Sequence, residues 1–597
     1  MPSLVDTASV VVWGGGTGGV AAAIQAARGG VSTLLLTPGS WLGGMVSAAG
    51  VCCPDGNELT PWQTGLWGAF LRELERREPE GLDHNWVSCF GYRPTTAEQI
   101  LQDWVRAEPK LLWWPCCRLL AVEREGALIS AMRLEIGGEQ RRVRCQVVID
   151  GSDRGDLLPY AEAPYRFGWE PQEQWGEPSA PSQSRLETEP FFREHPVQSP
   201  TWVVMGQLQS EHIPDGVGPA QLAEPFAQAL NAFGLEQTLT YGRLPGGLVM
   251  LNWPLHGNDW HWGLERAFSS DPTQEEQLDA EMQVHSLHFA EALIEASRGW
   301  LQLGEAFPAA SGSPAPWLAA MPYWREGRRV IGRSTVIEQD LLPEASGPSI
   351  APLPRDAGGA LQSIAVGNYA NDHHYPGPDW PLAPKSCRWG GRWSGTPFSI
   401  PYGALVSAEL DNLLAADKAF STSHMANGAT RLQPTILNVG QAAGAAAALA
   451  VRSGITPADL PVLQLQQLLI NDPLAPSAVL PLWDTPWHHP DWLLRQQSAL
   501  AEAALGPASP QPAPAAPGEL QLAAVVTAAP DGHFTISLNT PLGGRSCWPL
   551  ITLEPELNQL LQSIDTQAAV QLRGHLNPWG PWFRATELQL AAATNRS

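Results

Sequence analysis

A glycine-rich turn near the N-terminus constrains the fold of this chain more than any other feature. The turn, GGGTGG, spans Gly14–Gly19; it follows the apolar run SVVVW and precedes an alanine-rich segment, and a second apolar run spans Val31–Leu36. This order predicts a βαβ unit in which glycines permit the tight turn and let the backbone approach a pyrophosphate. The N-terminus of the following helix would offer its NH groups to the phosphates. The segment therefore predicts a dinucleotide site, and a purely structural glycine turn is the alternative.

Length and charge exclude several classes of protein. The 597 residues exceed a single hydrophobic core, and such a length predicts roughly three or four domains. The net charge of −24 argues against nucleic acids and anionic membranes as partners. No run approaches the roughly 18 consecutive apolar residues of a membrane span, and no basic signal-peptide segment opens the chain. We therefore expect a cytoplasmic protein.

The cysteines give no sign of a metal site. The adjacent pairs Cys52-Cys53 and Cys116-Cys117 lack both the CxxC spacing of redox motifs and the spacing of zinc ligands. Buried, reduced thiols are the expected state.

The order of predicted elements indicates an α/β fold with inserted parts. Amphipathic helices are expected over Thr60–Glu78 and Thr96–Glu108. Strand-like runs between Leu111 and Ile149 then predict a β-meander inserted into the main sheet. The βα rhythm disappears after about residue 160, where a long helix is expected over Thr273–Arg298, and returns from about Tyr323. The binding domain is therefore expected to be discontinuous.

Five parts follow from this order. Residues 1–160 and 321–475 would form the two parts of a Rossmann-like binding domain, and residues 161–320 an inserted α+β substrate or cap domain. Residues 476–518 would be a connecting segment that ends in a Pro/Ala-rich linker, which has too few large apolar side chains to pack. Residues 519–597 would form a small, mostly-β module without a motif of its own.

A segment far from the glycine turn favours a flavin. NAD domains usually complete their site within one Rossmann unit, whereas a flavin needs a remote part of the chain to cover its ring. The small residues GQAAGAAAA, which start at Gly440, predict a helix that begins there and lets a planar ring approach its first turn. The N-terminus of that helix would stabilise negative charge on a reduced flavin. Close helix packing without a ligand is the alternative.

Three further segments resemble a known family. They are WLGGMVSAAG, VVIDGSDRGDLLPYAEAPYRFG and NLLAADKAFSTSHMANGATRLQPTILNVGQAAGAAAALA. These segments are similar to motifs of the FAD-dependent oxidoreductases of the glutathione-reductase-like superfamily, whose layout resembles the flavoprotein subunits of succinate dehydrogenase and fumarate reductase. The resemblance covers roughly residues 8–470. It implies a Rossmann-like FAD-binding domain and FAD as the cofactor, and it is not specific for a substrate.

The resemblance also implies which residues hold FAD. It places Gly14, Gly16, Thr17, Gly18 and Gly19 at the pyrophosphate, Gly43, Gly44 and Met45 beside the ribityl chain and flavin, Asp150, Gly151 and Asp156 at the middle of the cofactor, and Gly440, Gln441 and Ala442 at the pyrimidine end of the ring. The family expects an acidic residue at the end of the second strand, where this chain has Thr37. A hydroxyl there would accept one hydrogen bond from the ribose, and a carboxylate is the stronger acceptor.

Four side chains are candidates for catalysis. His373 and His374 follow an apolar run and precede a Pro/Gly loop, so a strand end would present an imidazole for acid/base work near neutral pH. His424 and Arg431 lie just before the small-residue helix, where Arg431 would bind a substrate carboxylate or the developing charge of the flavin. Hydrogen bonding within a loop is the alternative for His373 and His374, and a buried structural role is the alternative for Arg431.

Two other clusters have weaker interpretations. The basic cluster Arg325, Arg328 and Arg329 would suit an anion, although a solvated helix face is favoured. The stretch Asn252–Trp262 combines aromatic and hydrogen-bonding side chains, which would line a site for a sugar-like or aromatic ligand or else pack a domain interface.

These observations predict an FAD-dependent oxidoreductase that oxidises a small organic substrate by hydride transfer to flavin N5. His373 or His374 would act as acid/base, and an unidentified electron acceptor would reoxidise the cofactor. An NAD(P)-dependent dehydrogenase is one alternative, but it leaves the Gly440 segment unexplained. A non-catalytic binding protein on a flavoprotein-like scaffold is another, which Thr37 and the absence of a decisive base make conceivable.

Overall fold

A five-stranded parallel sheet forms the centre of the fold. The computed structural model describes residues 5–345, 349–377, 380–383 and 386–591. The sheet has the order β18-β8-β2-β3-β4, and every neighbouring pair is parallel. Its strands are β2 (Val10–Trp13), β3 (Thr33–Leu36), β4 (Leu111–Trp114), β8 (Val147–Asp150) and β18 (Leu413–Ala415). Strands β2, β3 and β8 are buried along their whole length, as is typical of parallel strands covered on both faces.

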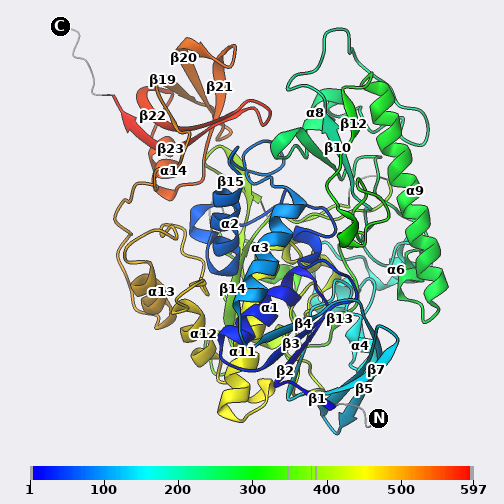
Figure 1. Cartoon of the computed structure of the whole chain (residues 1–597). Helices are drawn as coiled ribbons and strands as arrows, with labels where there is room; N and C mark the ends of the chain where they lie inside the picture. The colour runs from blue at the N-terminus through cyan, green and yellow to red at the C-terminus, as the bar shows by residue number, and fades with distance from the viewer. Residues whose placement is uncertain (1–4, 346–348, 378–379, 384–385, 592–597) are drawn as a thin grey trace.

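The predicted βαβ unit is confirmed, since α1 (Thr17–Arg28) joins β2 to β3. On one side of the sheet α1 packs against α11 (Gln433–Ser453), and α11 packs against α2 (Gly65–Arg77). Helix α3 (Pro94–Ala107) packs against α2. Thus the mixed α/β fold with a parallel sheet is the Rossmann-like arrangement that the glycine turn predicted, and residues more than 400 positions apart complete it (Figure 1).

An antiparallel meander extends from the main sheet. Strands β5 (Cys117–Glu125), β6 (Leu128–Ile136) and β7 (Glu139–Arg144) pair in sequence order, and β1 (Val5–Thr7) adds to β7 in parallel. The meander lies between β4 and β8 in the chain, where strand-like runs indicated it.

The middle of the chain forms a separate layer (Figure 1, green). Its sheet has the antiparallel order β11-β10-β12, made of Leu248–Leu251, Val204–Leu208 and Leu301–Leu303. The long helix α9 (Pro272–Ala296) packs against β10 and β12. Short helices precede and follow β10: α4 (Leu157–Tyr160), α5 (Gln172–Trp175), α6 (Gln183–Thr188), α7 (Phe191–Glu194) and α8 (Gly234–Thr240).

Two-stranded sheets and further helices complete the described part of the body. Three strand pairs occur: β9 (Tyr165–Arg166) with β13 (Arg329–Val330), β14 (Ser363–Asn368) with β17 (Pro397–Pro401), and β15 (Ser386–Trp389) with β16 (Arg392–Gly395). The helices are α10 (His424–Thr430), α12 (Val462–Ile470) and α13 (Trp492–Leu500).

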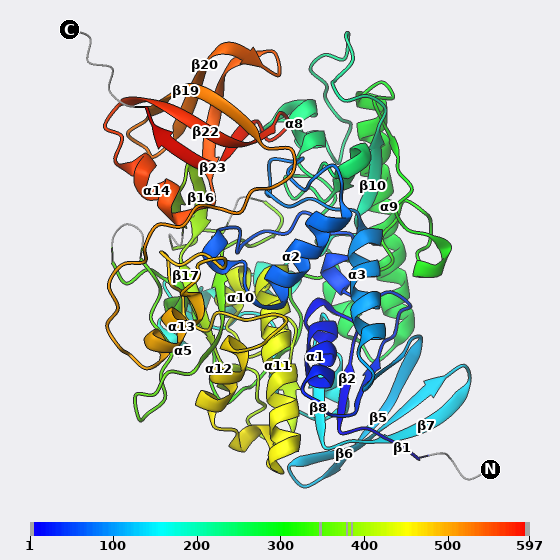
Figure 2. The same ribbon diagram turned by 60° about the vertical axis from the view of Figure 1, so that its left-hand side comes forward.

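Residues 520–590 fold into a closed five-stranded barrel with its own hydrophobic core. Its strands are β19 (Leu520–Ala528), β20 (Phe534–Leu542), β21 (Arg545–Thr552), β22 (Gln567–Asn577) and β23 (Trp582–Leu590), and α14 (Pro555–Gln562) joins β21 to β22. The barrel lies at the end of the molecule opposite the β5–β7 meander (Figures 1 and 2).

Among the described residues, α11 alone has the length and apolar composition of a membrane span. However, 89% of its most apolar window is buried inside the molecule, as is typical of a core helix.

Candidate functional site

A cavity of about 330 Å³ opens at the carboxyl ends of β2 and β3, and we call it the nucleotide cavity. Gly14, Gly15 and Gly16 form part of its lining. A Cβ at Gly14 would lie 2.5 Å from the backbone nitrogen of Ser152, and one at Gly16 would lie 2.6 Å from the carbonyl oxygen of Gly151. Only glycine permits so close an approach of these two backbone segments.

The structure brings most of the predicted FAD residues to this turn. The nitrogen of Gly43 donates to Gly15 O over 2.8 Å, and Thr17 Oγ1 donates to Gly43 O over 2.7 Å. Gly44 lies against Gly16, and Met45 is buried beside it in the same short helical turn. Gly18 and Gly19 pack against the backbone of Ala416 and Gly151 instead, so their small size serves packing.

The Asp150–Asp156 loop lies at the same edge of the sheet. Asp150 Oδ1 accepts hydrogen bonds from Ser152 N and Oγ, and its Oδ2 accepts one from Leu157 N. Burial raises the pKa of Asp150 to about 7. Asp150 therefore organises the loop, while Asp156 borders the nucleotide cavity itself.

Thr37 also borders the nucleotide cavity, but neighbours already use its hydroxyl. Thr37 Oγ1 donates to Gly39 O over 2.7 Å and accepts from Trp113 Nε1 over 3.0 Å. One lone pair remains for a ribose hydroxyl.

A buried charge cluster next to the first turn of α1 was not indicated by the sequence. Asp417 Oδ2 accepts a hydrogen bond from Gly18 N over 2.8 Å, and Lys418 Nζ pairs with Asp153 and lies 3.8 Å from Asp417 Oδ1. Burial raises the pKa of Asp417 to about 6. Asp153 lies 265 residues from Lys418 in the chain, which is why no local pattern reveals the cluster.

Replacing Lys418 with methionine would leave two buried carboxylates without a cation. Breaking a buried ion pair in this way destabilises a protein by about 3–5 kcal/mol, so we expect a loss of that size in the free energy of unfolding, measured by urea denaturation. Lys110, which is exposed, provides the matched control, and K110M should change the value by less than about 0.5 kcal/mol. Equal stabilities of the two variants would contradict the cluster.

The predicted helix start at Gly440 is wrong. Helix α11 begins at Gln433, so Gly440, Gln441 and Ala442 lie in its interior. A Cβ at Gly440 would lie 2.3 Å from Gly18 O of α1, and the Gln441 side chain bonds Leu66 N and Ala475 O. The small residues therefore serve close packing of two helices, which was the alternative reading of this segment.

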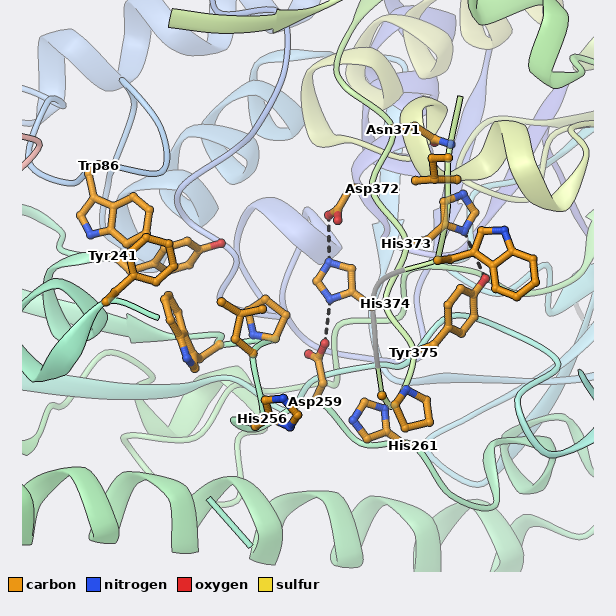
Figure 3. Close-up of a pocket in the computed structure, with 18 residues that line it drawn as sticks. Trp86, Tyr241, His256, Asp259, His261, Asn371, Asp372, His373, His374 and Tyr375 are labelled. Carbon is orange, nitrogen blue, oxygen red and sulfur yellow. Dashed lines mark hydrogen bonds and ion pairs between the residues drawn. The ribbon is translucent and has the colours of Figure 1, made fainter. Parts of the chain in front are cut away.

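A second cavity, of about 520 Å³, lies between the middle layer and residues 371–377, 380 and 382; we call it the histidine cavity (Figure 3). Aromatic side chains, among them Trp86, Tyr241 and Trp253, form one wall. His261, His373 and His374 and two carboxylates line another part. A neighbouring cavity of about 370 Å³ shares Trp86, Tyr241, Asp372 and His374 with it.

His374 lies between two carboxylates. Its Nδ1 is 2.7 Å from Asp259 Oδ2 and its Nε2 is 2.8 Å from Asp372 Oδ2 (Figure 3). Burial and Arg325 oppose a charge on the ring, but Asp372 and Asp259 outweigh both and raise the pKa of His374. Both nitrogens of His374 are bonded to carboxylate oxygens, so the geometry favours the protonated ring.

His261 has the opposite character. Burial lowers the pKa of His261 to about 4, although Asp259 opposes this change. Its Nδ1 forms one hydrogen bond with Ser199 Oγ, over 2.6 Å. Within the described ranges, no group bonds its Nε2. A neutral imidazole with one unbonded nitrogen thus lines the same cavity as a protonated one.

The arginines of this region are buried, and Arg325 and Arg329 form ion pairs, so the prediction of a solvated helix face is wrong. Arg325 lies 3.1 Å from Asp259, and Arg329 pairs with Glu170 and Glu326. The side chain of Arg328 is also buried. The carboxylate partners lie far away in the chain, with the exception of Glu326.

Arg431 lies at the start of α11, at a small buried cavity with Tyr323 and Gln433. Its guanidinium donates to Tyr323 Oη over 2.6 Å and pairs with Asp372 over 3.2 Å. The side chain is 2% exposed, whereas that of Asp372 is 40% exposed. Arg431 therefore orients Asp372, and Asp372 is the group that faces the cavity.

The remaining two candidates are further from open space. His424 is buried, with Nδ1 2.8 Å from Glu326 Oε1 and Nε2 bonded to Tyr375 Oη. Burial and Arg329 lower the pKa of His424 well below its ordinary value. His373 lines the cavity, and its two nitrogens contact Tyr375 Oη and Met425 O, both over 3.1 Å.

The sequence model of the FAD dependent oxidoreductase family matches residues 9–469. The chain belongs to this family. FAD is accordingly the cofactor of this FAD dependent oxidoreductase. The glycine cradle and the nucleotide cavity fit its adenosine diphosphate half, because the cradle lines the cavity and a Cβ at Gly14 or Gly16 would displace the backbone that shapes it. Segments 48–51 and 320–325 lie between the nucleotide cavity and the small cavity beside Arg431. Each of the two segments contributes lining residues to both cavities.

Solved structures similar to this FAD dependent oxidoreductase are distant in sequence. A triple mutant of the flavin-dependent brominase Bmp2 is 9% identical with a TM-score of 0.34, over 74% of this chain and 81% of that one. A geranylgeranyl bacteriochlorophyll reductase-like protein from Thermoplasma acidophilum is 10% identical with a TM-score of 0.33, over 84% and 89%. An L-proline dehydrogenase from P. horikoshii is 14% identical with a TM-score of 0.16, over 25% of this chain. The chain spans only 22% of that dehydrogenase's length and 48% of another Bmp2 structure. No curated protein matches the chain.

Proposed function

We propose that this FAD dependent oxidoreductase oxidises a small, neutral organic substrate in the histidine cavity. The observation that carries the proposal is the pair of histidines beside Asp259, whose pKa values are displaced in opposite directions. Titratable groups whose environments separate their pKa values are the usual acid and base of an enzyme. When bound, FAD supplies the acceptor for a hydride at N5.

His261 suits the role of proton acceptor. Its ring is neutral at physiological pH, and its Nε2 has no partner in the part of the chain that the structure describes. A substrate hydroxyl that bonds Nε2 would lose its proton to His261 as the adjacent carbon loses a hydride, which leaves a carbonyl group. Protonated His374 would hold the carboxylates of Asp259 and Asp372 in place beside the substrate.

The charges around the cavity favour a neutral substrate. Each of the cations His374, Arg325 and Arg431 is already paired with Asp259 or Asp372. A substrate carboxylate would have to compete with these buried pairs, so Arg431 would hold Asp372 and not a substrate carboxylate. The aromatic wall, in which Tyr241 and Trp253 meet edge to face with centroids 5.0 Å apart, would pack against the apolar face of a ring.

Anaerobic mixing of the FAD-loaded protein with defined substrates tests the proposal. We expect neutral aromatic alcohols or sugars to bleach the visible flavin absorbance, whereas 2-hydroxy acids of equal size do not. Bleaching by the acids alone would overturn the neutral-substrate assignment. Failure of every neutral alcohol in the panel would overturn the proposed oxidation.

A further inference from the structure

The turn between β22 and β23 of the C-terminal barrel, residues 577–582, contacts two segments of the oxidoreductase body. Asn577 Nδ2 donates to Asp83 Oδ1 over 2.7 Å and to Asn85 O over 2.8 Å. Trp582 Nε1 donates to both oxygens of Asp83 over 3.2 Å. Arg584 adds an ion pair to the same carboxylate at 3.3 Å. The barrel thus holds the 83–85 segment through one buried acid.

The second contact is a stacked cation. The guanidinium carbon of Arg243 lies 3.9 Å from the ring centroid of Trp579, and the ring of His84 lies 5.5 Å from it. Arg243 is buried, and its carbonyl oxygen accepts a hydrogen bond from Asn85 Nδ2 over 3.2 Å. The two body segments are therefore fastened to each other as well as to the barrel.

Both segments continue directly into the aromatic wall of the histidine cavity. Trp86 follows Asn85, and Tyr241 precedes Arg243 by two residues; both line the cavity. Their rings meet edge to face with centroids 5.1 Å apart. The barrel therefore contacts residues that adjoin Trp86 and Tyr241 in the chain.

A third element repeats this arrangement. Arg392 of β16 lines the adjoining cavity, lies 4.7 Å from the ring centroid of Trp582 and pairs with Glu58 over 3.1 Å. The turn before Arg392 is also hydrogen-bonded to the barrel. Gly390 O accepts from Thr552 N, and Gly390 N donates to Asn558 Oδ1.

We propose that the C-terminal barrel is a positioning domain for the substrate cavity, acting through the 577–582 turn on Trp86 and Tyr241. The barrel supplies no group to the lining of either cavity, so its residues are positioning residues and not catalytic ones. The proposal rests on the proposed function only in its kinetic consequence. Its structural consequence, restraint of the 83–86 and 241–243 segments, is independent of any activity.

The full-length variant W579A tests the proposal, because it removes the ring that stacks on Arg243. With a substrate that bleaches the wild type, we expect KM to rise roughly five- to tenfold, the effect of one desolvated cation–π contact, while kcat and FAD content stay within about twofold of wild type. Trp579→Phe keeps an aromatic face and should restore KM. Val525, which is 39% exposed on the barrel surface, supplies the control V525A, which should behave as wild type.

Hydrogen–deuterium exchange separates this inference from the proposed function. In W579A, amides of residues 83–86 and 241–243 should exchange faster than in the wild type, while those of α11 should not change. Unchanged exchange in both segments overturns the proposal, whatever the activity. Faster exchange throughout the molecule, or a parallel loss of kcat, FAD and thermal stability, also overturns it, since the ring would then be merely structural.

Discussion

Replacing His261 with glutamine is expected to lower kcat by about 10²–10⁴-fold, the usual contribution of a positioned general base, while the visible flavin spectrum stays unchanged. The reason is that His261 lines the histidine cavity and its Nε2 has no partner among the described residues, whereas both nitrogens of His374 are bonded to carboxylates. Glutamine retains a hydrogen-bonding group but cannot accept a proton. Stopped-flow measurement of flavin bleaching gives the rate directly.

His256 provides the matched control, because it lines the same cavity but is exposed. H256Q should retain kcat within about threefold, in keeping with the small effects of surface substitutions. If H261Q and H256Q bleach at equal rates, the assignment of the base to His261 is wrong.

The pH dependence of kcat/KM follows from the same two rings. His261 must be neutral to accept a proton, so activity is lost as pH falls through its pKa of about 4. His374 must stay protonated to keep its bonds to both carboxylates, so activity is also lost as pH rises through its pKa, which is raised above the ordinary value. We expect a broad bell-shaped profile. H374Q should remove the alkaline limb and leave the acid limb in place.

Replacing Gly16 with alanine is expected to abolish FAD binding. The added Cβ would lie 2.6 Å from Gly151 O and 2.7 Å from Asp417 Oδ2, distances at which the backbone of the cradle has to shift. The backbone must approach the pyrophosphate at this turn, so even a small shift removes the phosphate contacts. Flavin absorbance relative to protein absorbance after purification measures the effect.

Gly39 is the control for this substitution. It lines the same nucleotide cavity, and a Cβ there would meet nothing within 4 Å. G39A should purify with a full complement of FAD, and far-ultraviolet circular dichroism should show both variants folded. A G16A protein that is folded and fully loaded with FAD would refute the assignment of the cradle.

Local patterns predicted the parts of the fold that depend on neighbours in the chain. The βαβ unit, the meander and the helix α9 were all predicted, because hydrophobic period and glycine position act over a few residues. The position of Gly440 was predicted wrongly for a physical reason. Small residues let a planar ring approach the start of a helix, and they equally let a second helix pack against the interior of a helix. The pattern alone does not distinguish these uses.

The site shows the same limit more strongly. Arg325 was expected to be solvated because its acid partner, Asp259, lies 66 residues earlier in the chain. His261 was noted only as part of an aromatic stretch. Asp417 and Lys418 belonged to a quoted motif but were given no role. Burial and partners that lie far apart in sequence decide the charge state of each group, and neither can be read from local spacing.

The discontinuity of the central sheet has a consequence for synthesis. Strand β8 ends at Asp150, and it remains an edge of the sheet until β18, which begins at Leu413, has left the ribosome. At roughly 5–20 residues per second, that interval lasts about 13–53 s. During this time a nascent chain carries an apolar strand edge and the uncovered face of α1, so binding by a chaperone is the expected fate of the growing polypeptide.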